Sequence, residues 1–461
     1  MCLRRILLGA VAAPFLLAAV PALAEDCETS PSGLWERATL PGDFAGARTE
    51  WCKKGIQLGA LQTADYLNNP TGGLRRGGKY QGRLEMDLDL DFEKLAEMAG
   101  LTAHAGAFWV QGGRESGKNI GNLITVDNAE GVPALRLYTL WLQQSLWGDT
   151  VNVRLGQLAA DDEFAVSKVG TLFVNSTFGW PAAISANLPS GGPAYPLATP
   201  GVRLKIAFND QLSWMTGVFD GDPAGRPNGQ DAQYRNHDGT NFSLAEGSFT
   251  ITELGYAVNQ GKDDAGLAGG YKLGAWYNSE RFNDQRWDSK GLSLADANST
   301  GTGKPLRGDW GVYGVIDQML IREQPGADQG LSVFLRAGAS PSDRNVVSAY
   351  VDGGVAYKGL WAERPDDTVG FAFATAIVSD RLSALDNDTR RINNQPTRPV
   401  RDAETVLELS YQAQLAPWWT LQPDLQYVIH PGGNIPNPNS ATGLSPIGDA
   451  LVVGARSTVK F

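Results

Sequence analysis

Charged residues at every second position are the clearest chemical pattern in this sequence. In the stretch RLEMDLDLDF the polar positions are Arg83, Glu85, Asp87, Asp89 and Asp91. The alternate positions are all apolar: Leu84, Met86, Leu88, Leu90 and Phe92. Alternate side chains of a strand share one face. The pattern therefore predicts strands that present hydrogen-bonding and ionic groups on one side and an apolar surface on the other.

These residues do not combine into a recognisable catalytic arrangement. The three histidines, His104, His237 and His430, lie far apart in the sequence. There is no G-x-S-x-G or H-E-x-x-H motif, and GTGK at 301–304 lacks the spacing of a phosphate-binding loop. Catalysis needs a nucleophile, a base and an orienting group close together. We expect no enzyme, no cofactor and no metal site.

The first residues resemble an export signal. Residues 1–24 contain Arg4 and Arg5, an apolar run and an Ala22-Leu23-Ala24 cleavage motif, which predicts a secretory signal peptide. Removing it takes the formal net charge from −11 to −13, because both arginines are lost. Such an acidic chain is an unsuitable partner for nucleic acid.

The segment 25–55 is expected to form a periplasmic N-terminal segment. Its stretch GDFAGARTEWCKKGI predicts a helix over 43–54, with Asp43 as N-cap and Gly55 after its end. The exported chain keeps two cysteines, Cys27 and Cys52, in an oxidising compartment. Pairing in a disulfide is the simplest interpretation, and two unpaired thiols are the alternative.

Alternation of apolar and polar residues predicts sixteen strands after this helix. They are expected at 56–62, 82–92, 101–111, 134–145, 151–157, 201–208, 212–219, 251–258, 270–279, 310–319, 331–338, 348–357, 369–377, 404–415, 419–429 and 450–461. The gaps after odd-numbered strands are mostly long, and those after even-numbered strands are short. A soluble sandwich also alternates, but it does not sort its loops in this way. An outer-membrane barrel does, with short periplasmic turns and long external loops.

The predicted fold is therefore all-β: a 16-stranded antiparallel transmembrane β-barrel over 56–461, preceded by the short periplasmic helix. Lipid cannot satisfy backbone groups, so a spanning sheet must close on itself. The final strand fits this interpretation. Arg456 and Lys460 share one face, which we expect to meet lumen water, and the chain ends on Phe461, an interface aromatic that resembles an outer-membrane assembly signal.

Several stretches resemble the carbohydrate-selective porin family, the OprB family. They include GRESGKNIGN, RLYTLWLQQ, RLGQLAADDEF, GGVAYKGLWAERPDDTVG and LELSYQAQLAPWWTLQPDLQYVIHPGGN, and they span the mature chain in family order. The resemblance implies a channel for small sugars in the outer membrane, with loops folded inward to form a constriction.

The resemblance also implies constriction residues. Arg114 matches a pore-lining arginine of the family, and Glu130 or Asp127 stands where the family carries an acidic residue. The family's second arginine has no match here, and Arg136 is the expected substitute. The long loop 158–200, which contains Asp161, Asp162 and Glu163, is expected to fold into the barrel; an ordered external cap is the alternative.

The balance of charges predicted to face inward favours neutral solutes. Inward acids are expected at Glu85, Asp87, Asp89, Asp91, Glu253, Asp352, Glu404, Glu408 and Asp424, and inward bases at Arg83, Arg136, Arg154, Arg203, Lys205, Lys272, Arg336, Arg456 and Lys460. An anion-selective pore would favour a ring of one sign. We therefore expect passive diffusion of small neutral sugars; a general porin, a sugar-acid porin and a structural barrel remain alternatives. Expected partners are outer-membrane lipid, lipopolysaccharide and, through Phe461, the barrel-assembly machinery, and the chain is a monomer or a homotrimer.

Overall fold

The computed structural model describes residue 27 and residues 33–245, 247–261 and 264–461. The predicted signal peptide at 1–24 lies outside these residues. The strands are β1 (Ile56–Gly73), β2 (Gly77–Asp91), β3 (Leu101–Gly112), β4 (Ala134–Leu146), β5 (Val151–Leu158), β6 (Thr199–Ala207), β7 (Leu212–Asp220), β8 (Ser248–Val258), β9 (Gly269–Asp288), β10 (Gly303–Arg322), β11 (Gly330–Ala339), β12 (Val347–Lys358), β13 (Thr368–Val378), β14 (Ala403–Ala416), β15 (Trp419–Ile429) and β16 (Gly448–Lys460).

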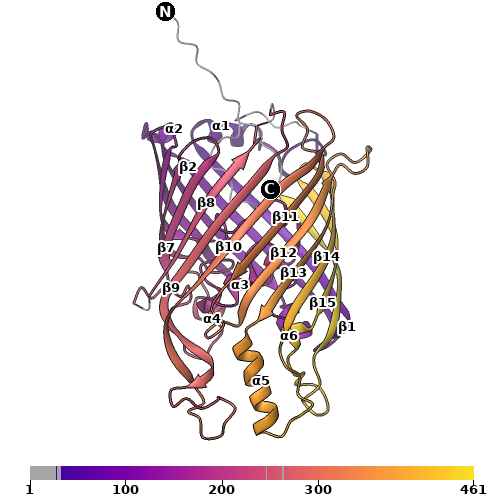
Figure 1. Ribbon diagram of the computed structural model, residues 1–461. Helices are drawn as coiled ribbons and strands as arrows, with labels where there is room; N and C mark the ends of the chain where they lie inside the picture. Colours follow the sequence, from indigo (N-terminus) through magenta and orange to yellow (C-terminus); the bar gives the residue numbers. More distant parts are fainter. Residues whose placement is uncertain (1–26, 28–32, 246, 262–263) are drawn as a thin grey trace, which may run out of the picture.

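Within the described chain these sixteen strands form one closed antiparallel barrel (Figure 1). Each strand pairs with its sequence neighbour, and β1 pairs with β16 to close the sheet. Closure leaves no unpaired edge among the strands, which is the condition for crossing lipid. The predicted fold class is confirmed.

The loops sort by length as the sequence predicted, except that the connections after β1 (74–76) and β11 (340–346) are short although they follow odd-numbered strands. The short turns lie at the upper end in Figure 1, beside the N-terminal helix, and the long loops lie at the lower end. The expected bounds of two loops, 63–81 and 280–309, were wrong. Strand β1 continues to Gly73 and β2 begins at Gly77, so the first loop is only 74–76. Strand β9 continues to Asp288 and β10 begins at Gly303, so the second loop is 289–302. The extensions of β9 and β10 run past the other strands at the lower end (Figure 1). The added part of β1 instead pairs with the middle of β16, as in Asp65 with Arg456, and the alternation there is broken at Leu67, Asn68 and Pro70.

The helices are short: α1 (Ala47–Lys53), α2 (Phe92–Ala96), α3 (Ala182–Ser185), α4 (Ala232–Arg235), α5 (Asp380–Ile392) and α6 (Pro431–Asn434), with single turns at Ser116–Ile120, Gly170–Leu172, Ser176–Phe178 and Pro189–Gly191. Helix α1 begins after Gly46 rather than at Asp43. Asp43 instead accepts hydrogen bonds from the Thr49 amide and hydroxyl, both at 2.8 Å. Helix α5, which lies at the long-loop end (Figure 1), was not predicted.

None of the helices in the described part of the chain is long and apolar enough to cross a membrane. The outward faces of the strands carry the apolar surface. Exposed side chains on these faces include Leu135, Leu140, Leu142, Leu155, Leu273, Leu335 and Leu425. Their exposure would be unfavourable in water and is favourable in hydrocarbon.

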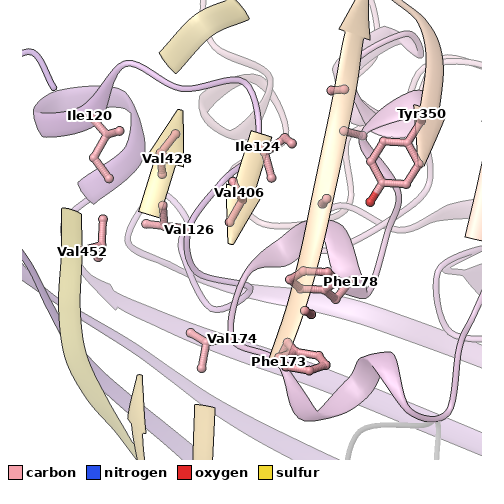
Figure 2. Close-up of a cluster of buried hydrophobic side chains, with 14 of the residues drawn as sticks. Ile120, Ile124, Val126, Phe173, Val174, Phe178, Tyr350, Val406, Val428 and Val452 are labelled. Atoms are coloured by element: carbon pink, nitrogen blue, oxygen red, sulfur yellow. The ribbon is translucent and has the colours of Figure 1, made fainter. Parts of the chain in front are cut away.

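The hydrophobic core lies inside the barrel (Figure 2). Phe173, Val174 and Phe178 come from the loop between β5 and β6, here called L3 (159–198). Ile120, Ile124 and Val126 come from the loop between β3 and β4, here called L2 (113–133). They pack on inward side chains of the wall, among them Val406, Val428, Val452 and Tyr350. The two loops therefore fill part of the lumen.

The N-terminal segment is attached where the barrel closes. A disulfide joins Cys27 to Cys52, with Cα atoms 5.7 Å apart. The Leu40 amide donates to the Lys460 carbonyl at 2.8 Å, and Arg48 donates to the Phe461 carbonyl oxygen at 2.9 Å. The segment thus contacts the end of the last strand next to the start of the first.

The disulfide is outside the sheet, so its removal is expected to leave the barrel intact. Cys27→Ser should give the same heat-modifiable band in SDS gels as the wild type, because the strand ladder closes without it. Loss of that band would contradict this expectation and would make the segment essential for closure.

Candidate constriction inside the barrel

Loop L3 is held inside the barrel by one buried arginine of the wall. Arg336 of β11 donates to the backbone carbonyls of Ala165, Gly179 and Thr177 at 2.9, 3.1 and 2.7 Å. Its Nε donates to Asp352 of β12 at 3.1 Å, and both side chains are almost fully buried. A guanidinium has five N–H donors and can bind a carboxylate and several carbonyls together. The predicted inward course of the loop is what the structure shows.

Wall carboxylates hold the loops in a second way, by accepting backbone amides. Glu408 accepts from Val174 and Asn175 of L3 at 2.6 and 3.1 Å. Glu404 accepts from Leu123 and Ile124 of L2, both at 2.7 Å. Neither acid is exposed. We expected such residues to line a water-filled lumen. They are instead buried beneath the loops, because hydrogen bonds from loop amides replace their hydration.

The same correction applies to Arg456. It is 4% exposed and does not face lumen water. It binds Asp65, its cross-strand neighbour on β1, at 2.9 Å and Asp127 of L2 at 3.0 Å. Asp127, a candidate for the constriction, is 1% exposed and therefore anchors L2 to the wall.

The acidic turn of L3 lies against strands β4 to β6. Asp161 accepts from the Tyr138 hydroxyl at 3.2 Å and from the Tyr195 amide at 2.9 Å. Glu163 bridges Arg203 at 2.8 Å and Arg154 at 3.4 Å. All three residues of the predicted set Asp161, Asp162 and Glu163 are partly exposed.

The surroundings of this turn shift the pKa values of Asp161 and Glu163 in opposite directions. Burial, opposed by hydrogen bonds from Tyr195 and Tyr138, raises the pKa of Asp161 to about 6. Burial also works to raise the pKa of Glu163, but the guanidiniums of Arg154 and Arg203 hold it below its ordinary value. Of these two acids, Asp161 therefore titrates just below neutrality, whereas Glu163 stays ionised to lower pH.

Cation preference of the channel is expected to fall as the pH is lowered through about 6. Asp161 is charged above its raised pKa and neutral below it, so the lumen loses a negative charge on acidification. Reversal potentials in a KCl gradient at pH 7.5 and 5 measure this change. Asp161→Asn should remove part of the pH dependence; an unchanged profile in the variant would assign the change to other groups.

The candidate Arg114 lies in L2 and reaches across to another loop. Its Nη1 binds Asp231, between β7 and β8, at 2.7 Å, and both side chains are about one-third exposed. Burial alone would raise the pKa of Asp231, but hydrogen bonds from Arg114 and the Gln233 amide hold it below its ordinary value. The expected partner Glu130 instead accepts from the amides of Glu115 and Ser116, both at 3.0 Å. Glu130 shapes the local turn of L2, which leaves Arg114 free to reach the neighbouring loop.

Arg136 is inward-facing, as predicted, but it is 1% exposed. It donates to the carbonyls of Val132 in L2 and Pro196 in L3, at 3.3 and 3.5 Å. It therefore supports the two loops from behind rather than standing in open water.

An aromatic cluster beside the acidic turn was not predicted. Phe108 of β3 stacks on Tyr138 of β4, with ring centroids 4.2 Å apart, and Tyr195 of L3 lies 5.5 Å from Phe108. Arg83 of β2 lies over both the Phe108 and the Tyr195 rings. Tyr138 and Thr139 both face inward at a register shift between β3 and β4. Because the shift interrupts the alternation in β4, the inward position of Tyr138 could not be predicted from the sequence pattern. The inward position of Phe108 in β3 could be predicted from alternation.

The structure thus brings L2, L3 and the β7–β8 loop together inside or at the mouth of a closed barrel. The charges in this region are mostly paired across signs, as in Arg336 with Asp352, Arg203 with Glu163 and Arg114 with Asp231. A transmembrane barrel narrowed by folded-in loops with mixed charges is the architecture of an outer-membrane diffusion channel.

Comparison with known proteins agrees with this class. Residues 75–461 match the family described as carbohydrate-selective porin, OprB family. The chain is 25% identical to Porin B of Pseudomonas aeruginosa, over 94% of this chain and 92% of that one. It is 23% identical to the putative porin QuiX of Acinetobacter baylyi, over 92% and 94% of the two chains. The structure of Pseudomonas putida OprB at high pH is similar in fold, with a TM-score of 0.79, 22% identity and coverage of 95% and 100%.

The chain belongs to the OprB family of carbohydrate-selective porins. It is an outer-membrane sugar channel.

Proposed function

We propose that this channel lets small neutral sugars of monosaccharide size, such as glucose, diffuse passively into the periplasm and selects them at the narrow region formed by L2 and L3. One observation carries the proposal. The charged groups of this region are paired with opposite charges and interleaved with tyrosines, so the wall offers hydrogen-bond donors and acceptors without a ring of one sign. Neutral polyhydroxy solutes can replace their water on such a wall, and charged solutes gain no net attraction.

Liposome swelling tests the proposal. Reconstituted protein should admit glucose faster than gluconate, a sugar acid of similar size, and faster than a disaccharide. Equal rates for glucose and gluconate would favour a general porin, and a faster rate for gluconate would favour a sugar-acid channel. Absence of swelling with every solute would favour a structural barrel.

Arg114 is proposed to narrow the mouth of this region together with Asp231. Arg114→Ala should raise KCl conductance and reduce discrimination among sugars of similar size, because the contact between L2 and the β7–β8 loop is lost. This pair, whose side chains are about one-third exposed, contributes little to stability, about 0–1 kcal/mol, so the barrel should form normally. Conductance and sugar rates both equal to wild type would make Arg114 an ordinary loop cation.

The proposed partners follow from the channel's surfaces. Sugars meet the lumen, and outer-membrane lipid and lipopolysaccharide meet the apolar outer face. Phe461 ends the closing strand, where its amide donates to the Ala60 carbonyl at 2.8 Å; we propose that it is read by the barrel-assembly machinery. Cross-linking in mild detergent distinguishes a monomer from a homotrimer. We expect no catalytic activity and no bound cofactor.

A further inference from the structure

Arg83 is held in the lumen wall by two aromatic rings. Its guanidinium carbon lies 5.1 Å from the centroid of Phe108 and 4.9 Å from that of Tyr195. These contacts attract the cation by the ring quadrupoles and fix the plane of the group. Phe108 is part of the barrel and Tyr195 belongs to L3, so Arg83 stands where the loop meets the wall.

The Arg83 guanidinium makes no hydrogen bond to any residue that the structure describes. Its Nε is buried and has no partner among the described residues, and the residue as a whole is 7% exposed. The closest carboxylate oxygen, Oε2 of Glu85, lies 3.6 Å from Nη2, which is longer than a hydrogen bond. Buried donors normally find partners. Arg83 therefore has N–H donors that could hydrogen-bond to a molecule in the lumen.

The groups around Arg83 are mainly acidic. Glu85, two residues along the same face of β2, has a side chain that is 26% exposed. Asp161 is bound to Tyr138, which stacks on the same Phe108 ring. Burial, followed by the charges of Asp161, Glu163 and Glu85, raises the pKa of Asp162 well above its ordinary value. Asp162 therefore adds little negative charge at neutral pH, and Glu85 is the acid whose measured distance places it beside Arg83.

We propose that Arg83 is a specificity-determining residue of the channel: it binds hydroxyl groups of the passing sugar, and Glu85 beside it excludes sugar acids. A sugar hydroxyl accepts a hydrogen bond from the arginine without meeting repulsion. A carboxylate is attracted by the same arginine but is repelled by Glu85, whose Oε2 lies 3.6 Å from Nη2 of Arg83. The net result favours the neutral sugar, although the binding group is a cation.

This inference rests on the proposed function, and glucose and gluconate fluxes into proteoliposomes test it. Glu85→Gln should raise the ratio of gluconate to glucose flux about three- to tenfold, because one repulsive charge at short range is removed. Arg83→Met should raise the half-saturating glucose concentration about fivefold, the effect of losing one hydrogen bond to a charged donor. Arg83→Lys keeps the charge and loses the planar fork. It should also raise this concentration while leaving KCl conductance unchanged, which distinguishes loss of donors from movement of L3.

Two results would overturn the inference while the proposed function stands. One is unchanged glucose saturation in both Arg83 variants; the other is an unchanged flux ratio in Glu85→Gln, in each case with a wild type that prefers glucose. A wild type that admits gluconate as readily as glucose would instead contradict the proposed function.

Discussion

Arg336→Ala is expected to release L3 from the barrel wall and to open the channel. The substitution leaves Asp352 buried without its partner and leaves the carbonyls of Ala165, Thr177 and Gly179 without a donor. Breaking a buried ion pair in this way costs about 3–5 kcal/mol. The sheet itself loses no backbone bond. We therefore expect a folded barrel with higher single-channel conductance in KCl and weaker discrimination among sugars.

The conductance and selectivity measurements need a control variant that loses a strand arginine without contact to L3. Arg281 of β9 is exposed at the long-loop end, and Arg281→Ala should change neither conductance nor selectivity. An Arg336 variant that conducts like wild type would show that the apolar contacts of Phe173 and Phe178 hold L3 without the arginine.

Leu335→Arg is expected to prevent stable assembly of the barrel. Leu335 precedes Arg336 on β11, near the middle of the strand, but it points outward and is 45% exposed. An arginine on the lipid face at the bilayer midplane costs about 2–4 kcal/mol. The yield of heat-modifiable barrel in the outer-membrane fraction measures the effect.

The matched control for Leu335→Arg is the same substitution at a different depth in the bilayer. Leu331 lies on the same face at the start of β11, near the short-turn end. There the same substitution costs only about 0–1 kcal/mol, so Leu331→Arg should assemble. Equal yields for the two variants would contradict the assigned facing or depth of β11.

The strands were predictable because their signal is local. Most predicted boundaries, such as 101–111 for Leu101–Gly112 and 419–429 for Trp419–Ile429, agree with the structure within a few residues. Alternation requires only that one face meets lipid and the other does not. It failed in the extensions of β9 and β10, which run past the other strands (Figure 1), and in β1, where Leu67, Asn68 and Pro70 break the alternation although this part pairs with the middle of β16.

The roles of the inward charges were not predictable in the same way. The sequence places Arg456 and Glu408 on the inner face, but it contains no sign that loops cover them. Asp65 and Arg456 are 391 residues apart and become neighbours only when β1 pairs with β16. Likewise, Arg114 finds Asp231, rather than Glu130, because the β7–β8 loop approaches L2.

By itself, then, the sequence determined the strand pattern, the choice of inner and outer faces, and the division into short turns and long loops, since each depends on residues close together in the chain. The tertiary structure alone decided which charges pair and which wall residues hold the loops in the lumen. It also decided that Arg83 keeps its donors unpaired between Phe108 and Tyr195. These outcomes depend on barrel closure and strand register, which bring together groups that no local pattern relates.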